Sequence, residues 1–199
     1  MTLDELAAQW EHCTKCTIGE HATHHVLWEV VSARTMEIVK ERVRVDMMII
    51  GEGPGLGEQA LGRPFVGPAG QLLRSTIQET QPAYADLTIC LTNLVACRPY
   101  SERLASPLNR APSKDEITAC MPRLASIMFM LKPEMVVAAG VLPDTYMKRT
   151  LKMARIMPTY FKIAHPSAII RSCRKQDRED YRQTFSNLFL FLEKVANAE

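Results

Sequence analysis

The sequence predicts an α/β protein in which helices cover both faces of a parallel sheet. Short, continuously apolar runs alternate along the chain with longer segments whose apolar residues recur at helical spacing. The first run, 45–51, is apolar over most of its length and ends in glycine, as expected of a buried strand. Ser113 and Glu116 form a capping-box pair that opens one of the helical segments. Strands that alternate with helices at this spacing favour a parallel sheet covered on both sides.

The expected elements follow from that alternation. Four strands are predicted at 45–51, 87–95, 134–140 and 159–166. Helices are predicted at about 3–12, 69–80, from the Ser113 cap to about 132, 142–152 and about 176–197. The last of these helices carries one apolar stripe, made of Tyr181, Phe185, Leu188, Phe189, Leu192 and Val195.

Composition limits the class of protein. The chain has 199 residues, with 47% hydrophobic and 23% charged side chains, so we expect a single soluble domain spanning residues 1–199. The formal net charge of +2 excludes a polybasic protein but not a local basic patch. The first ten residues are acidic and amphipathic, unlike a secretion signal, and no apolar run is long enough to span a bilayer. We therefore expect a cytoplasmic protein without a membrane partner.

Six cysteines in a reducing compartment point to a metal or cluster before disulfides. Cys13 and Cys16 form a Cys-x-x-Cys pair, which can place two thiolates on one metal, and Cys97 and Cys120 can complete a set of four. Spacing alone leaves zinc and an iron–sulfur cluster open. Taken singly, Cys97 or Cys120 is more often a small buried hydrophobe, and we assign Cys90 to that role.

The loop after the first strand, GEGPGLGEQALGRPFVGPAG, is rich in glycine without matching a nucleotide-binding motif. Gly51 and Gly53 lack the third glycine of a dinucleotide fingerprint because Leu56 stands there, and no Gly-Lys-Ser/Thr follows. Pro54 has no backbone N–H to offer a phosphate. The glycines can instead let a flat ring approach the backbone, with Phe65 stacked on that ring. The alternative is a tight connection with Phe65 in the core.

Polar residues follow the other predicted strands. Asn93 interrupts an apolar strand, and its amide offers one donor and one acceptor that can match the edge of a base or simply satisfy a strand end. His165 follows the fourth strand and precedes Ser167 and Arg171, which are natural phosphate contacts on a loop. Because sites in such folds lie at the carboxyl ends of the strands, these residues should meet the glycine-rich loop in one crevice.

At this level of detail the chain resembles the family 4 uracil-DNA glycosylases, the iron–sulfur branch of that superfamily. The motifs that carry the resemblance are GEGPGLGEQALGRPFVGPAGQLL, LTNLVACRPY, NRAPSKDEITACMPRL and HPSAIIR, and they run in the family's order from Cys13 to about Arg171. The resemblance implies a three-layer α/β/α fold with a central four-stranded parallel sheet. It also implies a [4Fe-4S] cluster held near the N-terminal segment by Cys13, Cys16, Cys97 and Cys120.

The resemblance implies uracil-containing DNA as the partner and assigns roles at the site. A flipped-out uracil would stack on Phe65 beside Gly53, and Asn93 would read its N3–H and O4 edge. His165 would donate a hydrogen bond to O2 of the leaving uracil. The water-orienting aspartate of family 1 relatives is matched here by Gly53, so we expect Glu52 to help the water.

The resemblance also assigns the DNA contacts and leaves two alternatives open. Ser167 and Arg171 would grip the DNA backbone, and we expect a monomer. The segment YSERLASPL, 100–108, looks inserted, as in a crosslinking branch of the superfamily, but the position of that branch's histidine holds Asn109. The second alternative is an inactive DNA-binding accessory module of the same fold, against which intact Glu52, Phe65, Asn93 and His165 argue.

Overall fold

The computed structural model describes residues 2–39, 44–83, 86–100, 109–172 and 174–196 of the chain. They form one sheet of five strands in the order β1-β3-β2-β4-β5. The strands are β1 (Trp28–Ser32), β2 (Met47–Gly51), β3 (Thr88–Asn93), β4 (Met135–Ala139) and β5 (Thr159–Ile163). The last four strands pair in parallel, whereas β1 is antiparallel to β3 at one edge.

Strand β1 corrects the expectation of a four-stranded parallel sheet. The four predicted strands are present, and the fifth was missed because its second residue, Glu29, is on the buried side, with an exposed fraction of 5%. A carboxylate in that place breaks the apolar pattern by which buried strands are recognised in sequence. An antiparallel edge strand on an otherwise parallel sheet is a common arrangement in α/β proteins.

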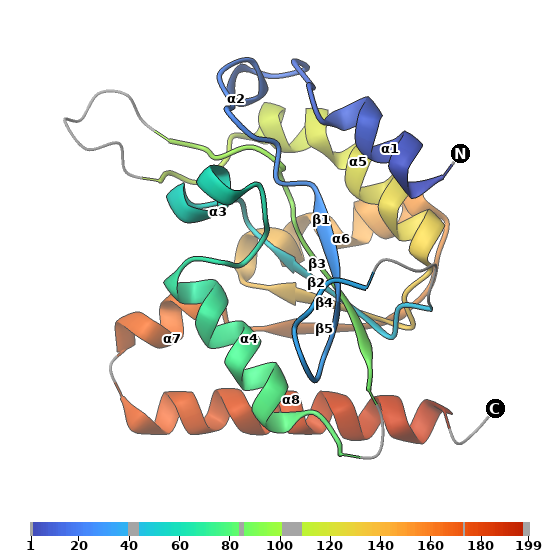
Figure 1. Ribbon diagram of the computed structural model, residues 1–199, viewed down its shortest axis with the longest axis vertical. Coiled ribbons are helices and arrows are strands. Elements are labelled where there is room, and N and C mark those ends of the chain that lie inside the picture. Colours follow the sequence, from blue (N-terminus) through green and yellow to red (C-terminus); the bar gives the residue numbers. More distant parts are fainter. Residues whose placement is uncertain (1, 40–43, 84–85, 101–108, 173, 197–199) are drawn as a thin grey trace.

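Eight helices within the described residues complete the layers around the sheet (Figure 1). They are α1 (Leu3–Trp10), α2 (Thr17–Glu20), α3 (Leu56–Leu61), α4 (Pro68–Thr80), α5 (Lys114–Leu131), α6 (Val141–Ala154), α7 (Pro166–Ser172) and α8 (Lys175–Ala196). Helices α1, α5 and α6 lie on one face of the sheet, and α4, α7 and α8 lie on the other. No helix in the described ranges is long and apolar enough to cross a membrane.

The two cores follow from the alternation of side chains along each strand. In β2, Met48 and Ile50 pack toward α1, α5 and α6, whereas Met47 and Ile49 pack toward α4 and α8. The predicted stripe of α8 covers the second core, and five of its six residues are buried, with Val195 half-buried. The α/β prediction, with both faces of the sheet covered, is therefore confirmed.

Helix α7 is a second correction, because the segment after His165 was expected to be a loop. Pro166 occupies the first helical position, where its missing N–H is not needed and its fixed φ favours the helix. Ser167 and Arg171 consequently lie one turn apart on the same helical face, and the Arg171 Nη1 donates to the Ser167 Oγ at 3.2 Å.

Candidate active site

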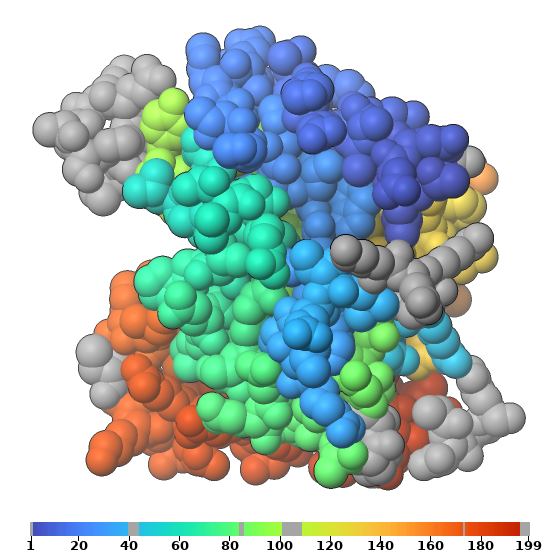
Figure 2. Space-filling model, in the orientation of Figure 1, coloured from blue at the N-terminus to red at the C-terminus, as the bar shows by residue number. Residues whose placement is uncertain are grey.

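The carboxyl edge of the sheet brings together the segments that the sequence analysis singled out. Gly51 and Asn93 are partners in the parallel register of β2 and β3. Beyond β4, Gly140 donates its N–H to the Ile163 carbonyl of β5 at 3.0 Å, and its Cα faces the His165 ring. The surface is hollowed between α3 and the α4–α7 pair, on the side toward which the parallel strands run (Figure 2; compare Figure 1).

Gly51 is where the aromatic ring and the amide meet. A Cβ at this position would lie 2.4 Å from the Asn93 Oδ1 and 2.7 Å from the Phe65 Cζ, so only glycine fits between them. Asn93 is 3% exposed and Phe65 is 5% exposed. Burial of Phe65 is required both by the ring-stacking interpretation and by the alternative in which it only fills the core.

The loop that carries Phe65 is clamped by charged side chains. Phe65 adopts a left-handed backbone with φ of 55°, and Gly70 leaves room for its carbonyl group. The Arg74 Nε donates to the Phe65 carbonyl and its Nη2 to the Pro64 carbonyl, both at 2.9 Å. The same Nη2 reaches the buried Glu29 carboxylate at 2.7 Å.

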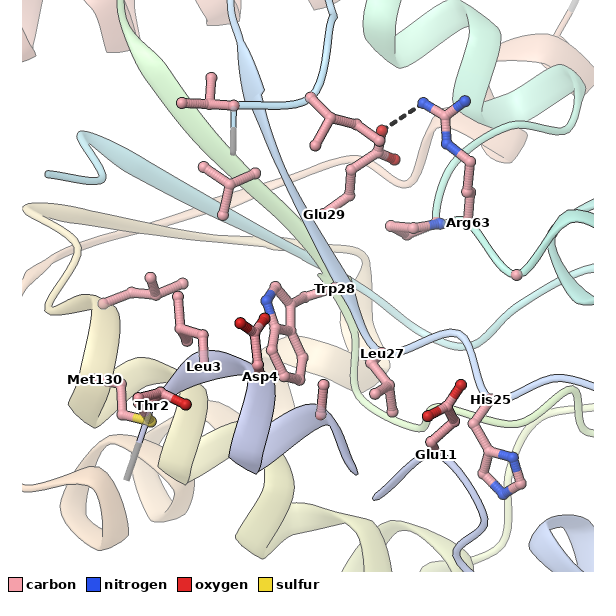
Figure 3. A pocket seen from close by; sticks show the side chains of 17 residues that line it. Thr2, Leu3, Asp4, Glu11, His25, Leu27, Trp28, Glu29, Arg63 and Met130 are labelled. Atoms are coloured by element: carbon pink, nitrogen blue, oxygen red, sulfur yellow. Dashed lines mark hydrogen bonds and ion pairs between the residues drawn. The ribbon is translucent and has the colours of Figure 1, made fainter. Parts of the chain in front are cut away.

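Glu29 also receives Arg63, from the turn that follows α3, on its other carboxylate oxygen (Figure 3). One carboxylate on the edge strand therefore holds two arginines that flank Pro64 and Phe65. Moving either arginine away would leave the buried Glu29 carboxylate without its partner, which costs several kcal/mol of stability. The two ion pairs therefore restrain the loop strongly. These bonds offset the unfavourable left-handed conformation of Phe65, which costs on the order of 1 kcal/mol.

Glu58, on α3, ties the two ends of the glycine-rich loop together. Its Oε1 accepts the N–H groups of Val66 and Gly67 at 3.0 and 2.7 Å, and its Oε2 accepts that of Gly55 at 3.1 Å. Three backbone donors on one carboxylate satisfy groups that a loop without regular structure would otherwise leave unpaired. Sequence analysis missed Glu29, Glu58 and Arg74, although the spacing of Glu58 after Gly55 matches a capping box.

His165 is held in one tautomer. The Ser167 N–H donates to the His165 Nδ1 at 3.2 Å, and the Ser167 hydroxyl lies 2.7 Å from the same nitrogen. Because Nδ1 accepts, the proton of the neutral ring is on Nε2, which is the donor that a leaving base requires. Burial lowers the pKa of His165, and the nearby Arg171 charge lowers it further. The neutral ring is thus the stable form near pH 7.

Glu52 and Gly53 follow Gly51 at the start of the glycine-rich loop. Burial raises the pKa of Glu52, and its backbone carbonyl accepts the Val95 N–H at 3.3 Å. A Cβ at Gly53 would meet Val95 at 3.0 Å and Pro99 at 3.3 Å. Gly53 therefore allows the glycine-rich loop to pack closely against the segment that follows β3.

Asn109 lies beside Gly55 of the glycine-rich loop. Its Nδ2 is 3.4 Å from the position that a Cβ of Gly55 would occupy, and its Oδ1 accepts the Arg98 Nε at 2.6 Å. Asn109 pairs with Tyr100 in an isolated antiparallel bridge. Residues 101–108, which make up most of the segment that looks inserted, lie outside the described residues.

Four cysteines line one cavity between α1, α2, α5 and the segment after β3. They are Cys13, Cys16, Cys97 and Cys120, and the other lining residues are Trp10, Lys15, Gly19, His25, Ala96 and Ala119. Burial raises the pKa of Cys97 to about 12, and the other three thiols raise it as well because they are near neighbours. No three ligating side chains in the described ranges already lie close enough together to hold a metal ion. The donor set itself, four thiols on one cavity, fits a thiolate-bound metal or cluster.

The segments around the cavity are fastened to one another. The Ala96 N–H donates to the Cys120 Sγ at 3.3 Å, which joins the chain after β3 to α5. Glu116, one turn earlier on α5, accepts two bonds from Arg110 at 2.6 and 2.8 Å and one from the Thr17 hydroxyl at 3.3 Å. The Arg110 guanidinium thereby lowers the pKa of Glu116. Cys90 lies within β3 and is fully buried, as expected of a small hydrophobe.

Comparison with known proteins identifies the class. The family described as the uracil DNA glycosylase superfamily matches residues 40–189, which is most of the chain. This protein therefore belongs to the uracil-DNA glycosylase superfamily.

Its relatives include enzymes of one type. A type-4 uracil-DNA glycosylase of Saccharolobus solfataricus is 31% identical over 204 residues, covering 91% of this chain and 84% of that protein. One of Pyrobaculum aerophilum is 34% identical over 142 residues, covering 71% of this chain and 62% of that protein, which is less than two thirds of its length. One of Thermotoga maritima is 27% identical over 197 residues, covering 92% of this chain and 90% of that protein.

Proposed function

We propose that this protein is a uracil-DNA glycosylase of DNA repair, which hydrolyses the N-glycosidic bond of uracil in DNA and leaves an abasic site. The observation that carries the proposal is the buried Asn93 amide beside Phe65 at the carboxyl edge of the sheet. Superfamily membership and the type-4 names of the relatives support the same activity. Its substrate is uracil-containing DNA, and it works as a monomer in the cytoplasm.

Recognition of uracil follows from the donor and acceptor of Asn93. Uracil presents N3–H as a donor and O4 as an acceptor, which an amide matches with its own oxygen and nitrogen. Cytosine presents the opposite pattern, so it would leave a donor facing a donor and an acceptor facing an acceptor. In a site where Asn93 is 3% exposed, water cannot compensate for that mismatch. Phe65 supplies the ring on which the flipped base stacks beside Gly53.

Bond cleavage places negative charge on the departing uracil and positive charge on the sugar. The neutral His165 donates its Nε2–H to O2 of the uracil, where the negative charge develops. Water then adds its hydroxyl group to C1′ of the sugar, and its proton is released. Glu52, which lies at the start of the glycine-rich loop, orients that water and favours the positive sugar when ionised.

The DNA backbone is held by one face of α7. Ser167 and Arg171 share one face of that helix, and their side chains are already hydrogen-bonded to each other. A hydroxyl and a guanidinium at this spacing can bind one phosphate together. Binding of DNA should therefore weaken as the salt concentration rises.

We further propose that Cys13, Cys16, Cys97 and Cys120 hold a [4Fe-4S] cluster. The cavity that all four thiols line supports this proposal. The cluster supplies a covalent link between α5, the segment after β3 and the N-terminal segment, and hydrolysis needs no electron from it.

Release of free uracil tests the activity. Purified protein is incubated with a single-uracil oligonucleotide and with the matching cytosine oligonucleotide, and free base is measured by mass spectrometry. We expect uracil from the first and no cytosine from the second. If the oligonucleotide is bound but no base is released, the accessory-module alternative is correct instead.

Metal content tests the cluster. Anaerobically purified protein should contain iron and sulfide and absorb broadly near the violet–blue boundary. Cys120→Ala should lose the iron and unfold at lower temperature, because ligation and folding are coupled. Cys90→Ala is the matched control, since Cys90 is buried but does not line the cavity. Stoichiometric zinc without iron would overturn the cluster assignment.

A further inference from the structure

Arg123 is a fully buried charge to which neither the sequence analysis nor the proposed chemistry assigns a role. It lies on α5, one turn after Cys120, and its exposed fraction is 0%. An arginine keeps its positive charge even in a protein core, because the guanidinium group is not deprotonated in proteins. Burying such a charge without a negative partner costs several kcal/mol. No carboxylate in the described part of the chain forms an ion pair with it.

The hydrogen bonds of Arg123 reach in two directions. On one side, its Nε donates to the Cys120 Sγ at 3.4 Å. On the other side, its Nη2 donates to the backbone carbonyl of Asn93 at 2.5 Å. Its Nη1 donates to the Leu27 carbonyl at 2.7 Å and to the Thr92 hydroxyl at 3.1 Å. One rigid guanidinium plane thus contacts both a cavity cysteine and the residue that reads the base.

Among the hydrogen-bond partners of Arg123 in the described residues, only the sulfur of Cys120 can carry a negative charge. Its other bonded partners are two carbonyl oxygens and a hydroxyl, which accept hydrogen bonds but leave the positive charge uncompensated. A cysteine that binds a metal does so as a thiolate. A metal-bound thiolate set is therefore the counterion that the buried guanidinium needs, and Arg123 in turn donates a hydrogen bond to one of its sulfurs.

The Asn93 side of the contact fixes a base-reading residue. The Asn93 Oδ1 lies so close to Gly51 that a Cβ there would be 2.4 Å away, so the place of the amide beside Phe65 depends on where the Asn93 backbone is held. The Asn93 residue is at the end of β3, where it pairs with Gly51 of β2 but has no partner in β1. Hydrogen bonds between strands therefore no longer hold its backbone from both sides. The bond from Arg123 takes over that restraint, so a shift of the guanidinium would move the amide.

We infer that Arg123 is a positioning residue that joins the cysteine set to the uracil pocket. Its guanidinium is the counterion of the metal-bound Cys120 thiolate and the clamp on the Asn93 backbone, so the metal centre helps to set the geometry of base recognition. This inference rests on the proposed function and on the proposed cluster. Its two contacts make separate predictions, one of which needs no activity.

The cluster contact is tested by the reduction potential of the reconstituted protein. Arg123→Met should shift the potential to a more negative value, because a cationic donor to a cluster sulfur favours the reduced form. Arg123→Lys keeps the charge and should shift it less. Arg149→Met, which removes one positive charge from the exposed side of α6, is the matched control and should leave the potential unchanged. An unchanged potential in Arg123→Met would overturn the counterion role.

The Asn93 contact is tested by a double-mutant cycle in single-turnover uracil release. Arg123→Met should lower the rate roughly 10–100-fold when Asn93 is present, the scale expected for misplacing a contact group by about 1 Å. In an Asn93→Ala background it should lower the rate less than about 2-fold, because the residue through which it acts is gone. Equal losses in the two backgrounds would mean that Arg123 only supports the fold.

Hydrogen–deuterium exchange separates failure of this inference from failure of the proposed function. Even if the unmodified protein released no uracil, exchange of a peptide covering residues 88–97 should be faster in Arg123→Met than in Arg149→Met. If Arg123→Met does not fold, Arg123→Lys replaces it, since one ammonium group cannot reach both the sulfur and the Asn93 carbonyl. Exchange and potential that match the unmodified protein in the lysine variant would contradict the inference.

Discussion

Gly51→Ala is the smallest change that disturbs the pocket without removing any group that contacts the base. A Cβ at this position would lie 2.4 Å from the Asn93 Oδ1 and 2.7 Å from the Phe65 Cζ, whereas ordinary contact begins at 3.4 Å. The amide oxygen must therefore retreat by about 1 Å and the ring by somewhat less.

Neither group can retreat easily. The Phe65 backbone is held by Arg74 through its carbonyl, and the Asn93 backbone is held by Arg123. The strain should lower the free energy of unfolding by about 1–3 kcal/mol, the usual cost of overpacking. Displacing the amide by about 1 Å should lower the rate of uracil release by roughly 10²-fold.

Gly57→Ala provides a matched control in the same loop. Gly57 lies within α3, and the nearest atom to its added Cβ is 3.8 Å away. Alanine there should stabilise the helix by up to about 1 kcal/mol and leave the rate unchanged. Both variants are compared in single-turnover excision from a uracil oligonucleotide. If Gly51→Ala released uracil as fast as Gly57→Ala, then Phe65 and Asn93 would not form the base pocket.

Four further predictions follow from the site. His165→Ala should slow uracil release roughly 10²–10³-fold with little change in DNA binding, and near-normal turnover would sink the leaving-group role. Burial and the nearby Arg171 charge lower the pKa of His165, so its ring stays neutral at pH values below 6.5, the pKa of an ordinary histidine. The excision rate should therefore stay level from pH 8 to 6.5 and fall only in more acid solution. A decline centred above pH 6.5 would contradict this role of the neutral ring. Glu29→Gln should release Arg74 from its charged partner, slow excision through Phe65 and increase the susceptibility of that loop to protease, and a variant with unmodified kinetics would show that the clamp is dispensable. The unmodified protein should leave no DNA adduct that survives boiling in detergent, because the amide of Asn109 is a poor nucleophile, and a stable band would assign it to the crosslinking branch.

The regular elements were predictable where pattern and burial agree. Continuous apolar runs predicted β2, β3 and β4, since both faces of those strands are covered. The edge strand β5 was predicted as well, although it is mostly half-buried and Lys162 in it is exposed. The capping box predicted at Ser113 is formed at the start of α5, and α1 also begins with a formed capping box, at Thr2. In each case the local signal and the tertiary environment favour the same structure.

Two of the missed elements, β1 and α7, depend on contacts or packing beyond the local sequence, and the short helices α2 and α3 were missed as well. In β1, Glu29 replaces an apolar residue because it binds arginines that come from a different part of the chain. In α7, Pro166 suggested a loop, although proline at the first helical position is equally a start signal. Which of these two meanings applies depends on packing beyond the local sequence.

Of the candidate site, the sequence predicted only the residues proposed to contact the base directly. Asn93 and His165 follow strands, so the topology rule placed them at one edge. Arg123 could not be found this way, because its partners at positions 27, 92, 93 and 120 converge only in the folded chain. The available signal was an arginine on the buried stripe of α5, between Cys120 and Ile127, where a solvated charge would not be expected.

The most direct test of base recognition by Asn93 is the ratio of kcat/KM for uracil DNA to that for cytosine DNA in Asn93→Asp, compared with the unmodified protein. A carboxylate offers two acceptors in place of the amide's donor and acceptor, so the match to O4 of uracil is lost and a match to the amino group of cytosine is gained. The ratio should fall at least about 10-fold, the equivalent of one hydrogen bond. An unchanged ratio would mean that Asn93 does not read the base and that uracil is selected elsewhere in the pocket.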